Sequence, residues 1–87
     1  MKIKNWNRIK TGTILIITWS DIKSENSWLK DDDAKNYAPA TCKDVGWFVN
    51  DDELNIRLTS SIADDGDKNI VVIPKGTIRD VKKISMR

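Results

Sequence analysis

The chain has 87 residues, of which 32% are charged and 39% hydrophobic, and its formal net charge is +2. This length fits one domain with a modest core, and the composition excludes general disorder. A single cysteine, Cys42, rules out an intrachain disulfide, and the absence of histidine removes the usual general base near neutral pH. No stretch approaches the roughly 20 apolar residues of a membrane span. We therefore expect a soluble protein of a reducing cytoplasm.

Residues 1–12 are expected to form a basic N-terminal arm, followed by a domain that spans residues 13–87. Ile3, Trp6 and Ile9 recur at three-residue spacing, which favours a helical turn lying on the domain. In one interpretation the arm covers an open sheet edge, and in the other it reaches for nucleic acid. The basic residues of the arm are Lys2, Lys4, Arg8 and Lys10.

Five short strands are predicted along the domain. The first, Thr13–Trp19, is apolar on both faces, so an interior must cover one face and the arm or a partner subunit the other. The run Leu54–Ile62 alternates with period two, which puts Leu54, Ile56 and Leu58 on one buried face and the alternate residues in solvent. The remaining strands are Asp44–Val49, Ile70–Ile73 and roughly Ile78–Ile84, the last two joined by a Pro-Lys-Gly turn.

Residues 20–42 are predicted to form a long first loop. Within it, Leu29–Ala38 favours one or two helical turns, with aspartates near the helix N-terminus and Pro39 as the stop. Five short strands with one long first loop are typical of an SH3-like barrel. We therefore expect an all-β fold, a small five-stranded SH3-like barrel with a short helical turn in the long first loop.

The sequence offers no motif for catalysis, metal binding or a cofactor. Cys42 has no histidine to activate it, and Ser60-Ser61 lacks a nucleophile elbow. The aspartates of Asp31-Asp32-Asp33 and Asp64-Asp65-Gly66-Asp67 are consecutive rather than spaced as calcium ligands. A helix N-terminus and a solvated turn explain these two clusters, so we expect no enzyme, no metal and no cofactor.

Four tryptophans are a high count for a chain of this length. Trp47 lies in an apolar run and is assigned to the core. Trp19 ends the first strand, and Trp28 lies in the long loop. An exposed tryptophan is a favourable anchor for a partner because it buries a large area at low entropic cost. We predict that Trp19, Asp21 and Trp28 form a contact group for a basic or apolar protein surface.

Four segments of the chain carry short motifs. They are W-x-D in Ile17-Thr18-Trp19-Ser20-Asp21, a loop tryptophan in Ser27-Trp28, V-G-W in Val45-Gly46-Trp47-Phe48-Val49 and I-P-x-G-x-I in Ile73-Pro74-Lys75-Gly76-Thr77-Ile78. In these motifs, over about residues 13–84, the chain resembles a group of small, mostly uncharacterised phage and prophage proteins. The resemblance implies a phage origin and an SH3-like barrel, and it implies no activity. The basic segment Lys2–Lys10 departs from the pattern.

Three hypotheses for function follow. The first is a non-enzymatic binding module, a phage-encoded accessory protein that binds and inhibits a host protein, such as a defence protein, in the host cytoplasm. The second is a protein that sequesters a small molecule or nucleotide, with Arg57, Lys75 and Arg79 as ligand-binding residues at an interface within a homo-oligomer. The third is nucleic-acid binding through the basic termini. Because only Arg57 is basic on the outward face of the third strand, nucleic acid is disfavoured. No membrane partner is expected.

Overall fold

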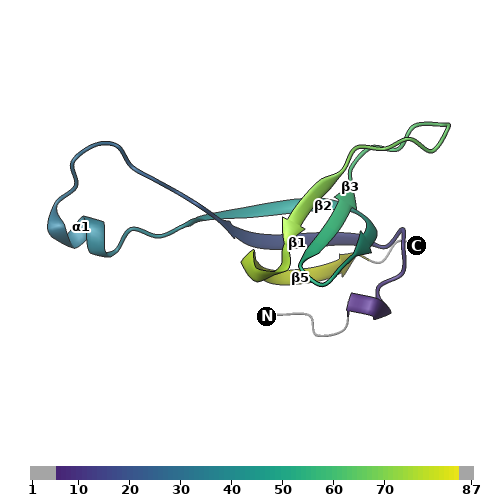
Figure 1. The fold of residues 1–87 in the computed structure, drawn as a ribbon, viewed down its shortest axis with the longest axis horizontal. Helices are drawn as coiled ribbons and strands as arrows, with labels where there is room; N and C mark the ends of the chain where they lie inside the picture. Colours follow the sequence, from purple (N-terminus) through teal and green to yellow (C-terminus); the bar gives the residue numbers. More distant parts are fainter. Residues whose placement is uncertain (1–5, 85–87) are drawn as a thin grey trace.

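The computed structural model describes residues 6–84, which form one antiparallel five-stranded sheet (Figure 1). The strand order is β4-β3-β2-β1-β5, so β4 and β5 are the edges, and no strand pairing in the described part of the chain closes the sheet. The predominantly β fold is thus as predicted. The strands are β1 Ile14–Asp21, β2 Ala40–Asp51, β3 Asn55–Thr59, β4 Val71–Pro74 and β5 Ile78–Ile84. Short helical segments are η1 Trp6–Arg8, α1 Asp31–Lys35 and η2 Lys75–Thr77.

Strand β1 lies between β2 and the edge strand β5 and pairs with both of them. Its alternating residues Leu15 and Ile17 are 0% exposed and point into the core, which defines the inner face of the sheet. Ile14 and Ile16 lie on the opposite, outer face and are half-buried. The buried core consists of Ile9, Leu15, Ile17, Phe48, Ile56, Leu58, Ile73 and Ile78.

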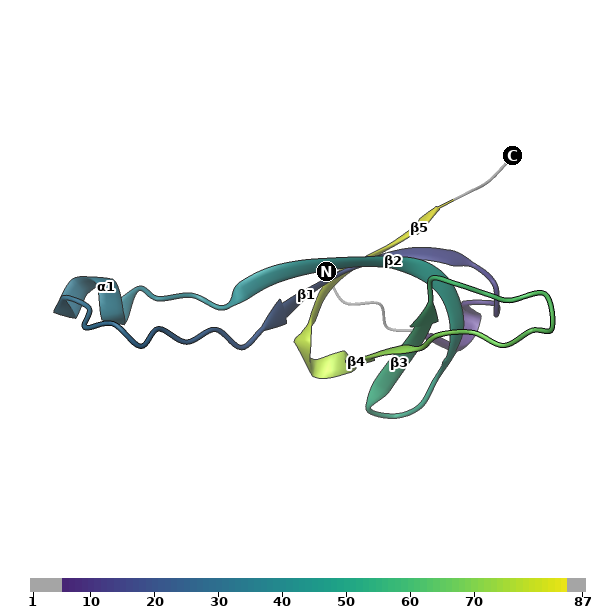
Figure 2. The same ribbon diagram turned by 90° about the horizontal axis from the view of Figure 1, so that it is seen from above.

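The long strand β2 passes very close to β3 at Gly46. A Cβ atom at this position would lie 2.7 Å from the carbonyl oxygen of Thr59 and 3.3 Å from the Cβ of Leu58. The register of β2 against β3 then shifts between Phe48 and Asn50, a bulge of the kind that bends and twists a strand. Figure 2 shows β2 curving from the β1 side of the sheet towards β3. The close approach and the bulge together let one sheet wrap around the core.

The described part of the N-terminal arm packs against the domain. The predicted helical turn is present as η1, where Trp6 packs on the core, and Ile9 is itself buried. The segment then joins β2, since the Gly12 amide donates to the Phe48 carbonyl at 2.8 Å and the Phe48 amide donates to the Thr13 carbonyl at 2.7 Å. Ile3, Lys2 and Lys4 lie outside the described residues.

The first loop is shorter than predicted because both flanking strands are longer. Asp21 pairs with Ala40, so the strands take up both ends of the 20–42 segment and leave residues 22–39 as the connection. The predicted helical turn is present as α1 within this connection. The signal for the longer β2 lies in the alternation around Cys42, which is half-buried between exposed Thr41 and Lys43.

The third strand is shorter than the predicted Leu54–Ile62. Leu54 is 71% exposed and precedes the strand, whereas Ile56 and Leu58 are buried as predicted. Beyond Thr59, a side chain replaces the backbone partners that a neighbouring strand would provide. The Oδ1 atom of Asn69 accepts hydrogen bonds from the amides of Ser60 at 2.9 Å and Ser61 at 3.1 Å. Thr59 also donates to this oxygen at 2.8 Å and is only 1% exposed, so its predicted place in solvent is wrong.

The substitution Gly46→Ala should destabilise the protein by about 1–3 kcal/mol, because the new methyl group meets a backbone carbonyl that has little freedom to move. Urea unfolding gives the free energy of unfolding. Gly76→Ala is the matched control: nothing lies within 4 Å of its added Cβ, and its effect should stay within about 0.5 kcal/mol. Equal losses for the two variants would contradict the close approach of β2 and β3.

Leu58→Ala should cost about 2–5 kcal/mol, because the truncated side chain leaves a cavity in a core where Leu58 is 2% exposed. Leu54→Ala removes the same atoms from a side chain that is largely in water, so its unfolding midpoint should barely change. Thermal or urea unfolding of both variants tests the assignment. A loss below 1 kcal/mol for Leu58→Ala would place this residue outside the core.

Candidate functional site

The connection between β1 and β2 projects from one end of the sheet, and residues 22–39 are called the hairpin extension here (Figure 1). Every residue in it is exposed. The two views agree that α1 lies at its far end, while the loop between β3 and β4 projects at the opposite end of the molecule (Figure 2). The extension therefore contributes nothing to the core, and its side chains are available to a partner.

The hairpin extension is ordered by short-range contacts. Glu25 accepts hydrogen bonds from the hydroxyl of Ser27 at 2.8 Å and from its amide at 3.3 Å, which lowers the pKa of this carboxyl group. Aspartates occupy the first turn of α1, where the helix dipole favours negative charge, and Lys35 pairs with Asp31 at 2.8 Å. The Lys23 ammonium lies 4.8 Å from the centre of the Tyr37 ring. These contacts hold a local conformation without help from the core.

Large apolar side chains on the hairpin extension face solvent. Trp28 is 101% exposed and Ile22 is 92% exposed, so neither has a packing role in the chain. Leu29 and Tyr37 are exposed to a lesser degree. Isolated apolar side chains are ordinary on a surface, but a fully exposed tryptophan together with three exposed apolar side chains on one projecting segment makes the extension a candidate binding surface.

The three residues of the predicted contact group have different environments. Trp19 is half-buried on β1 and packs against the core, and its indole Nε1 donates to Asp44 Oδ2 at 2.7 Å. Asp21 is exposed at the last position of β1, where its carboxylate accepts a hydrogen bond from the Ile22 amide at 2.8 Å. Trp28 lies further out on the extension. The structure thus places Trp19 and Asp21 at the base of the extension and Trp28 beyond it.

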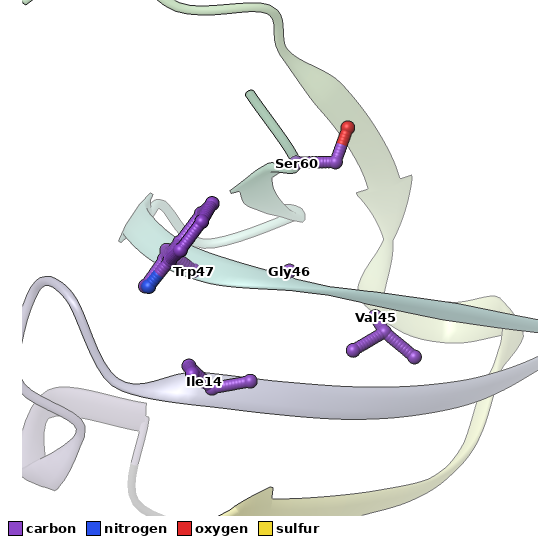
Figure 3. A pocket seen from close by; sticks show the side chains of 5 residues that line it. All are labelled: Ile14, Val45, Gly46, Trp47 and Ser60. Carbon is purple, nitrogen blue, oxygen red and sulfur yellow. The ribbon is translucent and has the colours of Figure 1, made fainter. Parts of the chain in front are cut away.

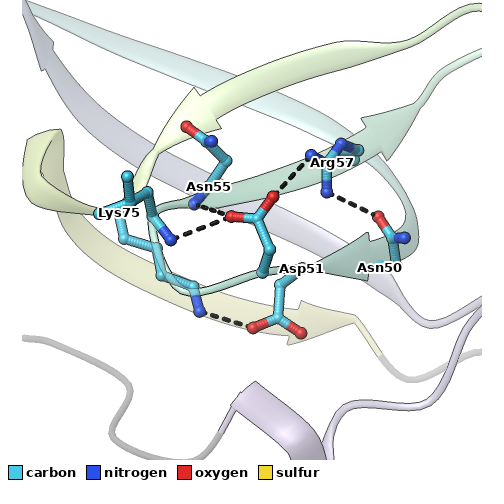
Figure 4. A network of polar contacts seen from close by, with 7 residues as sticks. Asn50, Asp51, Asn55, Arg57 and Lys75 are labelled. Carbon is cyan, nitrogen blue, oxygen red and sulfur yellow. Dashed lines mark hydrogen bonds and ion pairs between the residues drawn. The ribbon is translucent and has the colours of Figure 1, made fainter.

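The alternative ligand-binding cations are engaged with side chains of the protein itself. Arg57 donates to Asp52 Oδ2 at 2.7 Å and to Asn50 Oδ1 at 3.1 Å, as Figure 4 shows. Lys75 forms an ion pair with Asp51 at 2.5 Å, in which both side chains are about four-fifths buried, and its ammonium lies 5.4 Å from the centre of the Trp6 ring.

The third cation of that set, Arg79, lies on β5. It donates to the Ser20 hydroxyl at 3.3 Å, which places its head group beside β1. The side chains of Arg57 on β3 and Lys75 on η2, in contrast, reach carboxylates near the β2–β3 turn (Figure 4). Asp52 links Arg57 to the backbone of the turn, because its carboxylate also accepts hydrogen bonds from the amides of Leu54 at 2.9 Å and Asn55 at 2.8 Å. Arg57 and Lys75 therefore stabilise the turn.

A hollow of about 240 Å³ lies on the outer face of the sheet (Figure 3). Its lining is mostly apolar and comes from Ile14, Val45, Gly46, Trp47 and Ser60. Trp47 was predicted to lie in the core, and this assignment is wrong, because the side chain is 37% exposed. The alternation of β2 explains the error: Phe48 points inwards, so its neighbour Trp47 points outwards. Sequence reasoning missed this surface, although the period-two pattern around Gly46 contains the signal.

No group of three or more His, Cys, Asp or Glu residues within residues 6–84 is arranged to hold a metal ion. The helices in this part of the chain are all too short or too polar to cross a membrane. No family model, curated protein or solved structure matches the chain. The surfaces described above are therefore the basis for assigning a function.

The pKa of Asp52 is lowered from 3.8 to about 2, first by the hydrogen bond from Arg57 and then by the backbone amides of Asn55 and Leu54. In Arg57→Gln this pKa should rise towards 3.8, whereas Lys75→Gln, which affects Asp51 instead, should leave it unchanged. Titration of the side-chain carboxyl carbon by NMR measures both.

Because the pKa of Asp52 is lower in the folded state, its stabilising contribution is present above about pH 4 and is lost as the pH falls towards 2. Arg57→Gln should therefore flatten this part of the stability profile. A wild-type pKa close to 3.8 would contradict the network.

Proposed function

We propose that this chain is a non-enzymatic protein-binding module whose hairpin extension carries the contact surface. The observation that supports this function is Trp28, which is 101% exposed on a segment that projects from the sheet. Covering a tryptophan of this kind removes a large apolar area from water, and buried tryptophans are frequent energetic anchors of interfaces.

The extension has the chemistry for a partner surface that is basic and apolar. Ile22, Trp28, Leu29 and Tyr37 supply apolar area, and the exposed aspartates of α1 supply negative charge. Asp21 adds a carboxylate at the base. Trp19 is half-buried, and through its hydrogen bond to Asp44 and its packing on the core it also fixes the end of β1 from which the extension starts.

We further propose that the sheet is an SH3-like barrel and that the protein is a phage accessory protein that binds and inhibits a host protein. Three features support the barrel: the first strand pairs with the last, η2 separates β4 from β5, and the sheet bends at Gly46. The phage origin and the host target rest on the sequence resemblance alone. A host protein fits the extension better than a nucleotide does, because Arg57 and Lys75 already pair with carboxylates.

Trp28→Ala should abolish retention of the partner from host lysate and leave the melting temperature unchanged, because the side chain makes no packing contact in the free protein. Affinity purification with tagged protein, followed by mass spectrometry, measures retention. Leu54→Ala is the matched control, since it removes an exposed apolar side chain at the β2–β3 turn instead. Equal retention by wild type and Trp28→Ala would remove the extension from the binding surface.

A second variant separates binding from folding. Because Asp21 and Ala40 are paired directly, residues 22–39 can be replaced by Asn-Gly, a two-residue turn that suits a β-hairpin. This variant should fold and lose the partner. If it unfolds, the extension has a structural role that its exposure does not reveal.

A further inference from the structure

We propose that the outer face of the sheet is an interface between two copies of this chain, related by a two-fold axis that runs along β1. This surface is separate from the hairpin extension, so the inference does not depend on the proposed partner. The outer-face patch consists of the apolar residues Ile14, Ile16, Val45, Trp47 and Ile84.

The patch is exposed although it is apolar. Val45 is 55% exposed, and Trp47 and Ile84 are each 37% exposed. Trp6 and Ile9 pack against the core cluster, which lies on the inner face, so this part of the N-terminal segment covers the side of β1 opposite the patch. Both faces of the apolar strand β1 are expected to be covered. The described residues cover only its inner face.

Strand register arranges the outer face in three rows across β5, β1 and β2, because directly paired residues point to the same side of a sheet. Moving along β1, the surface changes from wholly apolar to charged. The rows are Ile84, Ile14 and Trp47, then Lys82, Ile16 and Val45, and finally Asp80, Thr18 and Lys43.

A two-fold axis along β1 makes this surface complementary to itself. The axis places each row against the same row of the second copy and exchanges the positions of β5 and β2. Ile14 then meets Ile14 of the second copy, and Ile84 meets its Trp47. In the third row the negatively charged Asp80 of one copy lies opposite the positively charged Lys43 of the other, twice per dimer. This match of charge and apolar character singles out a second copy as the occupant.

The remaining pair is compatible with the same arrangement. Lys82 lies on the edge strand β5 and faces Val45 of the second copy. The aliphatic part of a lysine side chain packs on an apolar residue while its ammonium group stays in water at the rim. Sheets that pack face to face keep their strands within about 30° of each other, which preserves the order of the rows.

The interface is small, so the dimer is expected to be weak. Three rows on three strands provide less than the roughly 1,200 Å² of total buried area that characterises stable complexes. We expect a dissociation constant of about 10–1000 µM. Sedimentation velocity over this concentration range should show the weight-average sedimentation coefficient rising from that of a monomer towards that of a dimer.

The test compares two variants of the full chain, each of which replaces an exposed valine by lysine. Val45→Lys places a charge in the centre of the patch and should weaken association at least tenfold. Val72→Lys introduces the same charge at a position of similar exposure, 50% against 55%, on β4 outside the patch, and should associate as the wild type does. Thermal unfolding confirms that both variants fold. Equal association of the two, or a wild type that stays monomeric at about 1 mM, would overturn the proposal.

A charge exchange tests the two-fold axis itself. Lys43→Asp should weaken the dimer because two like charges then face each other, and adding Asp80→Lys should restore it at least in part. Restoration by the double variant requires the two residues to meet across the interface. If the double variant associates no better than Lys43→Asp alone, the axis is wrong. A variant lacking residues 1–5 that dimerises while the full chain does not would show that the N-terminal segment occupies the patch instead.

Discussion

The approach of β2 to β3 at Gly46 is the constraint on which the rest of the fold depends. A side chain there would collide with the Thr59 carbonyl, so glycine suits the close approach of these two paired strands. Next to this position, Phe48 and the β3 residues Ile56 and Leu58 join Leu15 and Ile17 of β1 in the core. A domain of this size has a modest core, so each close contact between its strands contributes noticeably to stability. Gly46 thus lets the two strands pack closely beside the core.

Much of the fold could be predicted from the sequence because period-two patterns are local signals. The bounds of the last strand, Ile78–Ile84, agree with the prediction, as do the inward positions of Ile56 and Leu58. The errors have non-local causes. β3 ends early because Asn69, ten residues beyond Thr59, satisfies the backbone amides after it. β2 begins early because residues 40–43 pair with β1; their alternation is a local signal, but their register against β1 cannot be deduced from either strand alone.

The candidate surfaces were harder to predict because exposure depends on tertiary structure. Trp28 was identified correctly as a loop residue, but nothing in its neighbours shows that the loop projects away from the sheet. Trp19 lies between polar residues and Trp47 lies in an apolar run, yet Trp19 is held by Asp44 on the inner face and Trp47 is on the outer face. The same holds for the predicted ligand-binding cations. The sequence alone does not show that Arg57 and Lys75 form ion pairs with Asp52 and Asp51 in the folded chain.

The separation of the hairpin extension from the core has a consequence for how such a chain can change. Mutations in residues 22–39 are not constrained by packing, and the cost of closing a longer loop grows only slowly with its length. Asp21 and Ala40 form the last pair between β1 and β2, so insertions, deletions and substitutions within residues 22–39 leave the pairing of the sheet intact. The sequence of the extension can therefore diversify rapidly on an unchanged scaffold, in the way that surface loops diversify on other rigid frameworks. Divergence should concentrate in the extension, while Gly46 and its contacts stay fixed.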